Sequence, residues 1–181
     1  KVNVKSIHSE YLDKENINKE FTDLDGIIVA PGFGQRGLDG KILAVEYARV
    51  NKVPFLGICL GMQMAVIEYA RNVKKIRYAN STEISEKCKD PVIDLMVSQK
   101  EIINKGGTMR LGAWDCEILK NTISSKIYSK KVVSERHRHR YEFNNEYSKK
   151  IFDDNFIVAG RNPETNLVEI VENKDHPWFV G

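Results

Sequence analysis

The stretch FLGICLGMQ, Phe55–Gln63, decides the fold. It passes from a short apolar run into Gly57-Ile58-Cys59-Leu60-Gly61 and then into a pattern typical of a helix. A residue between a strand end and a helix start, with Gly on both sides, can turn so sharply that its side chain projects at the carboxyl edge of the sheet. The spacing G-x-C-x-G therefore predicts a strand–turn–helix elbow with Cys59 at its tip.

Two physical effects favour chemistry at Cys59. The sulfur would lie near the amino end of the following helix, where unpaired N–H groups stabilise thiolate over thiol. The backbone N–H of Leu60 would point toward an oxyanion formed on a carbon that the sulfur attacks. The alternative is that a cysteine after four apolar residues is simply a small buried hydrophobe. The two flanking glycines favour the reactive thiol.

A second loop matches the first. Pro31-Gly32-Phe33-Gly34 directly follows the apolar run Ile27–Ala30, so its amides should lie at the carboxyl end of a neighbouring strand. Gly32 is the candidate for a second oxyanion donor. A simple turn is the alternative, but two such loops after two strands of one sheet favour a site.

The rest of the chain predicts one α/β domain over residues 1–181. Strand-like runs alternate with helix patterns in the first half, which indicates a parallel sheet flanked by helices, whereas the second half is richer in strands. The middle, 74–108, contains turn signals and only a weak strand or helix around 92–97. The predicted strands are 2–7, 24–30, 53–58, 111–119, 132–144, 156–160 and 167–172, and the predicted helices are 38–50 and 60–72.

Composition excludes several classes of protein. The 28 basic and 25 acidic residues are spread along the chain, which implies no nucleic-acid partner. No apolar run approaches the roughly 20 residues that cross a bilayer, and the start is unlike a signal peptide, so we expect no membrane and a cytoplasmic location. Cys59, Cys88 and Cys116 lack the spacing of a disulfide framework or a zinc site, so no metal is predicted.

Further motifs carry a family resemblance. GICLGMQ and PGFGQRG, followed in order by YANSTE, GGTMRLG, ERHRHRYEFNN, VAGR and HPWFV, cover almost the whole chain. Together they resemble the class I, or triad-type, glutamine amidotransferase domain, and in particular the glutaminase domain of the CTP synthase family. The elbow alone is shared by many enzymes, whereas R-H-R-H-R-Y-E with G-G-T-M-R-L-G is much more specific. The resemblance implies an α/β fold with a flavodoxin-like, mostly parallel sheet, flanking helices and additional β structure in the second half.

The resemblance also implies roles for individual residues. Cys59 would attack the side-chain amide of L-glutamine while the Gly32 and Leu60 amides hold the oxyanion. The chemistry suits the substrate, because Glu83 could bind its α-ammonium group and Arg138 its α-carboxylate; without the resemblance, Glu83 is equally well an ordinary solvated acid. The implied glutamine-binding residues are Gly32, Leu60, Gly61, Met62, Gln63, Glu83 and Arg138.

For the whole protein, the resemblance implies a ligase. No cofactor is expected in this domain. Ammonia would pass to a synthase domain of the same polypeptide, upstream of Lys1, where ATP and Mg²⁺ support conversion of UTP to CTP. GTP would act as an allosteric activator near Phe33 and Arg110, and the enzyme would be a homotetramer.

The run Arg136–Arg140 allows other interpretations. As a strand, it would place its three arginines on one face and His137 and His139 on the other. Two histidines make a poor zinc site, and an RNA-binding surface would need stacking aromatics. The role of Arg138 toward the glutamine carboxylate, with structural hydrogen bonds for the other residues, is preferred.

The expected imidazole is not among these motifs. In the family, the catalytic His and its Glu belong to an F-H-P-E stretch, which we expect after Gly181. His176 should be structural, because it would lie roughly 13–17 Å from the edge where Cys59 emerges, and His8 has no better claim. A strand and helix are also expected before Val2, and the segment between Val97 and Gly106 is shorter than in the family. The domain is therefore expected to be incomplete at both ends.

Two other functions stay open at this point. A non-catalytic glutamine- or effector-binding module that regulates a partner would explain the missing His and Glu. Alternatively, the same fold could supply ammonia to another biosynthetic ligase, or hydrolyse a γ-glutamyl amide. Fold alone does not distinguish these substrates.

Overall fold

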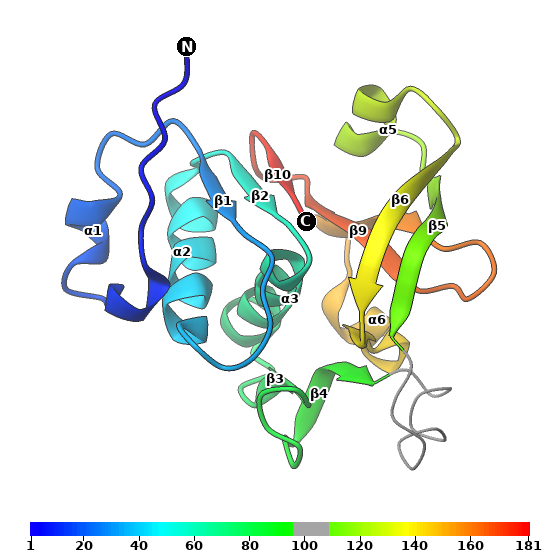
Figure 1. Ribbon diagram of the computed structural model, residues 1–181, viewed down its shortest axis with the longest axis horizontal. Coiled ribbons are helices and arrows are strands. Elements are labelled where there is room, and N and C mark those ends of the chain that lie inside the picture. The colour runs from blue at the N-terminus through cyan, green and yellow to red at the C-terminus, as the bar shows by residue number, and fades with distance from the viewer. Residues whose placement is uncertain (96–108) are drawn as a thin grey trace.

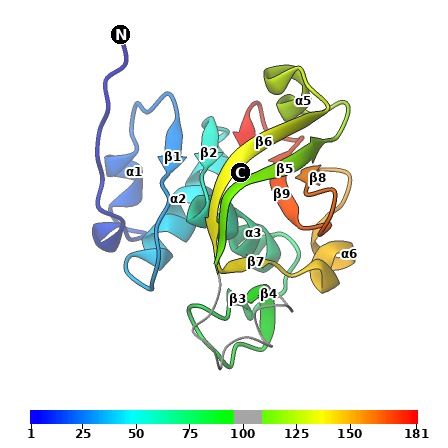
Figure 2. The ribbon, with the colours of Figure 1, turned by 45° about the vertical axis from the view of Figure 1, so that its right-hand side comes forward.

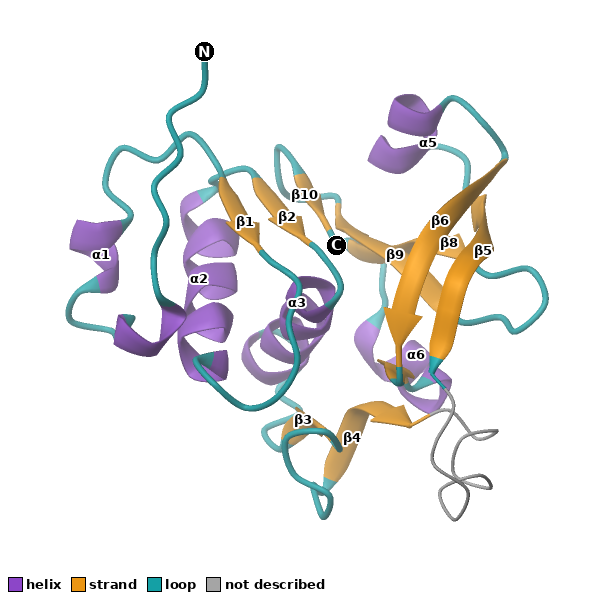
Figure 3. Cartoon of the chain, in the orientation of Figure 1, coloured by secondary structure: helices purple, strands orange, loops and turns teal. Residues whose placement is uncertain are grey.

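The computed structural model describes residues 1–95 and 109–181, in which helices and strands form a mixed α/β arrangement (Figures 1 and 3). The helices are α1 (Ile17–Glu20), α2 (Leu38–Asn51), α3 (Leu60–Asn72), α5 (Ile123–Tyr128) and α6 (Ser148–Ile151), with 3₁₀ turns η1 (Ser9–Tyr11) and η3 (Asn145–Tyr147). The strands are β1 (Ile27–Val29), β2 (Phe55–Gly57), β3 (Ala79–Ser81), β4 (Asp90–Leu95), β5 (Arg110–Ile118), β6 (Val132–His139), β7 (Tyr141–Phe143), β8 (Phe156–Arg161), β9 (Val168–Asn173) and β10 (Phe179–Val180).

The larger of the two described sheets has seven strands in the order β1-β2-β10-β9-β8-β5-β6. Strands β1, β2 and β10 are parallel, whereas every pairing from β10 to β6 is antiparallel. The predicted α/β class and the additional β structure in the second half are confirmed. In this larger sheet, parallel pairing is confined to β1, β2 and β10, where β2 leads into the elbow and the other two strands flank it.

Helix α3 is the centre of the core. Its residues Leu60–Ala70 are all buried, as expected for a helix that is enclosed on every side. The helix contacts α2, β1 and β2 and also β3, β4 and α6. It is therefore held by both sheets, and Gln63 in its first turn donates to the carbonyl oxygen of Tyr141 in β7.

Most predicted elements of the first half are confirmed. The runs at 24–30 and 53–58 contain β1 and β2, and the helix patterns at 38–50 and 60–72 match α2 and α3. The prediction of a strand at 2–7 is wrong: Val2 and Val4 are 84% and 85% exposed in an extended segment without strand pairing. The alternation of Val2 and Val4 with Asn3 and Lys5 is typical of a half-buried strand, but both valines stay exposed, so the pattern alone did not secure a partner for that face.

The middle of the chain is more regular than predicted. Strands β3, β4 and β7 form a three-stranded sheet in which β3 and β4 are parallel and β4 and β7 antiparallel. The turn-forming residues Asn80 and Ser81 lie within β3 and beside a register shift, which explains why their signal suggested a loop. The Gly106-Gly107 turn and the short segment between 97 and 106 lie outside the described residues.

Strands in the second half are confirmed at each predicted place. The long run at 132–144 is divided at Arg140 into β6, which pairs with β5, and β7, which pairs with β4. Figure 2 shows the β5–β6 hairpin curving toward the helical half of the domain.

Candidate active site

Cys59 occupies the predicted elbow. Strand β2 ends at Gly57, α3 begins at Leu60, and Cys59 between them has φ 57° and ψ −106°. Side chains at the two flanking positions would collide with backbone: a Cβ at Gly57 would lie 2.7 Å from Gly61 C, and a Cβ at Gly61 would lie 2.2 Å from the carbonyl oxygen of Val29. The glycines therefore allow the first turn of α3 to approach β1 and β2.

Two backbone amides converge on the sulfur, which accepts hydrogen bonds from the N–H groups of Leu60 and Gly32. Gly32 follows β1, which pairs in parallel register with β2 through Val29 and Gly57. The ends of the two strands are thus level, and the loop after each one lies at the same edge of the sheet. Both predicted donors lie beside Cys59, in an arrangement suited to a negatively charged oxygen.

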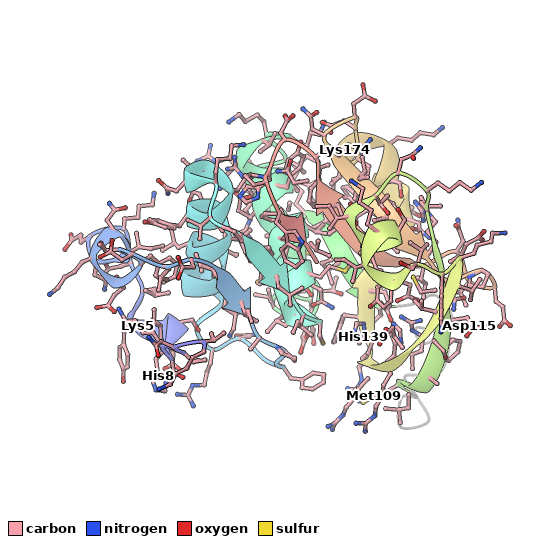
Figure 4. The ribbon with its side chains drawn as sticks, turned by 90° about the horizontal axis from the view of Figure 1, so that it is seen from above. Lys5, His8, Met109, Asp115, His139 and Lys174 are labelled. Carbon is pink, nitrogen blue, oxygen red and sulfur yellow. The ribbon has the colours of Figure 1, made fainter. Side chains whose placement is uncertain are left out.

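His139, at the end of β6, contributes an imidazole to the same place. It hydrogen-bonds to Cys59, and its Nδ1 lies 3.2 Å from Glu142 Oε2. In Figure 4, His139 lies between the β5–β6 hairpin and the helical half of the domain. The structure therefore assembles a thiol, an imidazole and a carboxylate in series.

The electrostatics of this series favour a thiolate. Burial alone would raise the pKa of Cys59, but the hydrogen bond and charge of His139, with the two amides, outweigh it and lower the pKa. Burial likewise opposes a charged imidazole, yet the contacts with Cys59 and Glu142 raise the pKa of His139 to about 10. The contact between the two groups therefore stabilises the charged form of each, the thiolate and the imidazolium.

A buried network continues behind Glu142. Arg110 Nε lies 3.0 Å from Glu142 Oε1, and its two terminal nitrogens contact both oxygens of Glu169 at 2.6 and 3.0 Å. His137 Nε2 lies 2.7 Å from Glu169 Oε2, and its Nδ1 is 2.8 Å from the carbonyl oxygen of Glu135. The contacts of His137 agree with the predicted structural hydrogen bonds, whereas His139 also contacts Cys59. Both histidines face inward, and the three arginines of the run are exposed.

Two of the residues implied to bind glutamine contact the loop after β1, and a third, Gln63 of the elbow helix, contacts β7. Glu83 Oε1 accepts a hydrogen bond from the N–H of Gly34 at 3.0 Å. The guanidinium of Arg138 lies 5.4 Å from the ring centre of Phe33 in the same loop. Gln63 Nε2 donates to the carbonyl oxygen of Tyr141 at 3.0 Å. Their roles toward a substrate stay predictions.

Other predicted site residues have structural positions. Gly61 has no side chain, and its N–H donates to Ile58 O at 2.9 Å. The side chain of Met62 is buried in the core and is not offered to a ligand. Arg110 is 3% exposed and held by two carboxylates, and its role toward an effector stays a prediction. Phe33 is 55% exposed, and its effector role stays a prediction.

The other histidines are distant from this chemistry or fully engaged. His176 is buried, its Nε2 lies 3.0 Å from Ala48 O, and its Nδ1 accepts from the N–H of Trp178 at 3.2 Å. Burial lowers its pKa, so it is a neutral structural residue, as predicted. His8 is exposed near the amino terminus, and Figure 4 shows it far from His139.

Among residues 1–95 and 109–181, no group of three or more His, Cys, Asp or Glu side chains is placed to hold a metal ion. Within the same residues, no helix combines the length and the apolar character needed to cross a bilayer. Cys59, Cys88 and Cys116 are all free thiols. Burial raises the pKa of Cys116 to about 12 and also raises that of Cys88, so Cys59 is the only thiol of the three whose pKa is lowered.

Sequence reasoning missed that His139 contacts Cys59 and that Glu142 contacts His139. The available signal was the alternation in the Arg136–Arg140 run, which placed both histidines on one face. What the pattern did not contain was the break at Arg140, which returns the chain to α3 and brings Glu142 beside His139.

Comparisons with known proteins agree with this geometry. Residues 1–181 match the family described as glutamine amidotransferase class-I. The chain is 59% identical over 180 residues to a CTP synthase of Christiangramia forsetii and 56% identical over 181 residues to one of Flavobacterium johnsoniae. These alignments cover 99% and 100% of this chain but 33% and 34% of the relatives, so the chain spans about a third of their length.

A solved structure is similar throughout. The structure described as Trypanosoma brucei CTPS, glutaminase domain with bound acivicin, is 37% identical with a TM-score of 0.93, and the match covers 99% of this chain and 71% of that one. The match extends over both the parallel strands with the elbow and the antiparallel strands with His139. The chain therefore belongs to the class-I glutamine amidotransferase family.

Proposed function

We propose that this chain is the glutaminase domain of a CTP synthase, which hydrolyses L-glutamine at Cys59 and delivers ammonia to a synthase domain of the same protein. The observation that carries the proposal is the convergence of the Gly32 and Leu60 amides on a sulfur whose pKa is lowered. The similarity to CTP synthases over the whole chain supports the choice of substrate and product.

The arrangement accounts for each chemical step. The sulfur of Cys59 attacks the side-chain carbonyl carbon of glutamine, and the oxygen, now negatively charged, is held by the two amides. When the carbon–nitrogen bond breaks, the nitrogen takes up a proton from a general acid, a role that the family's histidine would fill, and leaves as ammonia, so that a thioester remains. Water then gives a proton to the resulting base as its oxygen adds to the thioester carbon, the carbon–sulfur bond breaks, and glutamate leaves with the thiolate restored.

Charge complementarity supports the proposed orientation of glutamine. Glu83 lies against the loop that carries Gly32, where its carboxylate suits the α-ammonium group of the substrate. Arg138 lies above Phe33 in the same loop, where its exposed guanidinium suits the α-carboxylate. Gln63 is buried, so it contributes through the position of the elbow helix.

The product ammonia has a defined use in this proposal. In the synthase domain, ATP and Mg²⁺ activate UTP for amination to CTP, with GTP as activator and a tetramer as the assembly. An F-H-P-E stretch after Gly181 would supply the family's His and Glu. A non-catalytic regulatory module is not favoured, because such a module needs no polarised thiol.

The test uses the full-length protein with UTP, ATP, Mg²⁺ and either glutamine or ammonium ion. Cys59→Ala should abolish glutamine-dependent CTP formation, with ammonium-dependent formation retained within about twofold of wild type. Cys88→Ala is the matched control and should retain both activities, because Cys88 lies outside the site and burial raises its pKa. Loss of both activities in Cys59→Ala would contradict the assigned role, and failure of the wild type to form CTP from either nitrogen source would contradict the proposed product.

A further inference from the structure

We propose that His139 is a second functional group at Cys59, whose imidazolium, oriented by Glu142 and Arg110, holds the sulfur as a thiolate. This inference rests on the proposed glutaminase function and deepens it. It assigns a role to residues that are separate from the histidine expected after Gly181.

The contacts of His139 leave one ring nitrogen for the sulfur. Its Nδ1 is engaged by Glu142 Oε2 at 3.2 Å, so Nε2 is the nitrogen available to Cys59. The imidazole is 16% exposed and the carboxylate 4% exposed, which limits competition from water. In such surroundings, a charge-assisted hydrogen bond to sulfur is stronger than the same contact at an open surface.

Arg110 explains why Glu142 keeps its orientation. Its guanidinium binds Glu142 through Oε1, which leaves Oε2 for His139, and binds Glu169 through two further nitrogens. Removing a charged partner from such a buried pair leaves an uncompensated charge. From the sulfur inward, negative and positive groups therefore alternate through His139, Glu142 and Arg110.

The ionisable groups that face His139 come from four elements. Cys59 approaches from the start of α3, Glu142 from β7, Arg110 from the directly opposite position on β5, and His137 from β6 itself, with ring centres 5.4 Å apart. Burial opposes protonation of His139, whereas Cys59 and Glu142 favour it. The favourable contacts prevail, because the pKa of His139 is raised to about 10.

The decisive experiment measures the titration of Cys59 directly. The full-length protein is alkylated with iodoacetamide from pH 5 to 10, and the rate at Cys59 is followed by mass spectrometry of its peptide. In His139→Gln, the side-chain amide can still reach the sulfur but carries no charge. We expect the midpoint of the rate profile to move upward by about one pH unit and the rate at pH 7 to fall about threefold, because the higher intrinsic nucleophilicity partly offsets the smaller thiolate fraction.

Two controls separate this effect from general damage. His137→Gln changes the neighbouring histidine, which belongs to the same network but is bound to Glu169, and should move the midpoint by less than about 0.3 units. The half-buried Cys88 serves as an internal reference, since its alkylation profile should be the same in every variant. A change at both cysteines would indicate altered folding rather than a local effect.

Glu142→Gln provides a second test of the role of His139, which can be measured if His139→Gln does not fold. It retains the shape of the side chain and should also move the Cys59 midpoint upward. An unchanged midpoint in the folded variants would overturn the proposal. Alkylation requires no glutamine, so the two claims can fail separately. An upward shift of the midpoint in the variants, without glutamine hydrolysis by the wild type, would overturn the proposed function alone. Glutamine hydrolysis by the wild type, with an unchanged midpoint in the variants, would overturn this inference alone.

Discussion

The backbone conformation of Cys59 leads to a prediction that does not depend on its sulfur. With φ 57° and ψ −106°, Cys59 has a conformation that residues with a Cβ rarely adopt. Such a conformation costs about 1–3 kcal/mol and persists because the surrounding structure imposes it. Here β2, β1 and the first turn of α3 impose it, since all three meet at the elbow. We therefore expect Cys59→Gly to be more stable than Cys59→Ala.

The magnitude follows from two opposing effects. Glycine relieves the strain of about 1–3 kcal/mol, but its greater freedom in the unfolded chain costs about 0.5–1 kcal/mol relative to alanine. The net preference for Cys59→Gly is therefore about 1 kcal/mol, within limits of about 0–2.5 kcal/mol. Both variants lack the sulfur, so the loss of its interaction with His139 cancels in the comparison.

Amide hydrogen exchange in the full-length protein measures the difference in stability between Cys59→Gly and Cys59→Ala. The exchange rates of peptides that cover α3 give the free energy of opening of this helix in each variant. Ile58 provides the matched control, because it is the preceding residue of the same elbow and its φ is not positive. There the order should reverse, with Ile58→Gly less stable than Ile58→Ala by about 0.5–1 kcal/mol. If Cys59→Gly is no more stable than Cys59→Ala while the Ile58 pair behaves as expected, the elbow stores no strain and the reasoning fails.

Three further predictions concern stability. Gly61→Ala should destabilise α3 by about 1–3 kcal/mol in the same exchange experiment, because its Cβ would lie 2.2 Å from a carbonyl oxygen of β1. Arg49→Met should cost about 3–5 kcal/mol in denaturant unfolding, since Glu68 is fully buried and bonded to Arg49 at 2.6 Å, and Glu68→Leu in the same chain should recover most of the loss. Asp153→Asn should cost about 1 kcal/mol at pH 6, discounted for the one-third exposure of the carboxylate, and only a small part of that at pH 2. Burial raises the pKa of Asp153, but the ion pair with Lys74 lowers it to about 2. This stability is therefore fully present above the unfolded value near 3.9 and is lost as pH falls through about 2, so an equal loss at both pH values would contradict the assignment.

The elbow could be predicted from sequence because its causes are local. Two glycines, a cysteine and the change from a strand pattern to a helix pattern all lie within Phe55–Gln63. The position of Gly32 also followed, since parallel strands of one sheet end at a common edge. The outcome agrees, because both amides meet the sulfur.

The environment of the sulfur could not be predicted in the same way. Nothing near His139 in the sequence indicates that it lies beside a residue 80 positions earlier, because that contact depends on the curvature of a sheet. The same limitation applies to Arg110, because its place in the sequence does not indicate that its guanidinium is buried between two carboxylates. A long polar side chain in a strand pattern does not reveal whether its partners are solvent or buried acids.

The strand order explains how the two halves of the site meet. Strand β2 carries the elbow, and β6 lies at the far edge of the same sheet, separated from it by β10, β9, β8 and β5. A flat sheet would hold His139 far from Cys59, so the antiparallel strands must curl back over the start of α3, as Figure 2 shows for the β5–β6 hairpin. The contacts that fix this return come after the break at Arg140, where Tyr141 pairs with Leu95 of β4 and its carbonyl oxygen accepts from Gln63 of α3. Because β4 also packs on α3, the helix that presents the nucleophile is the element that anchors its imidazole. The contact between Cys59 and His139 therefore depends on the tertiary fold, in which the antiparallel strands return over the start of α3. The thiol itself is positioned by the nine consecutive residues Phe55–Gln63.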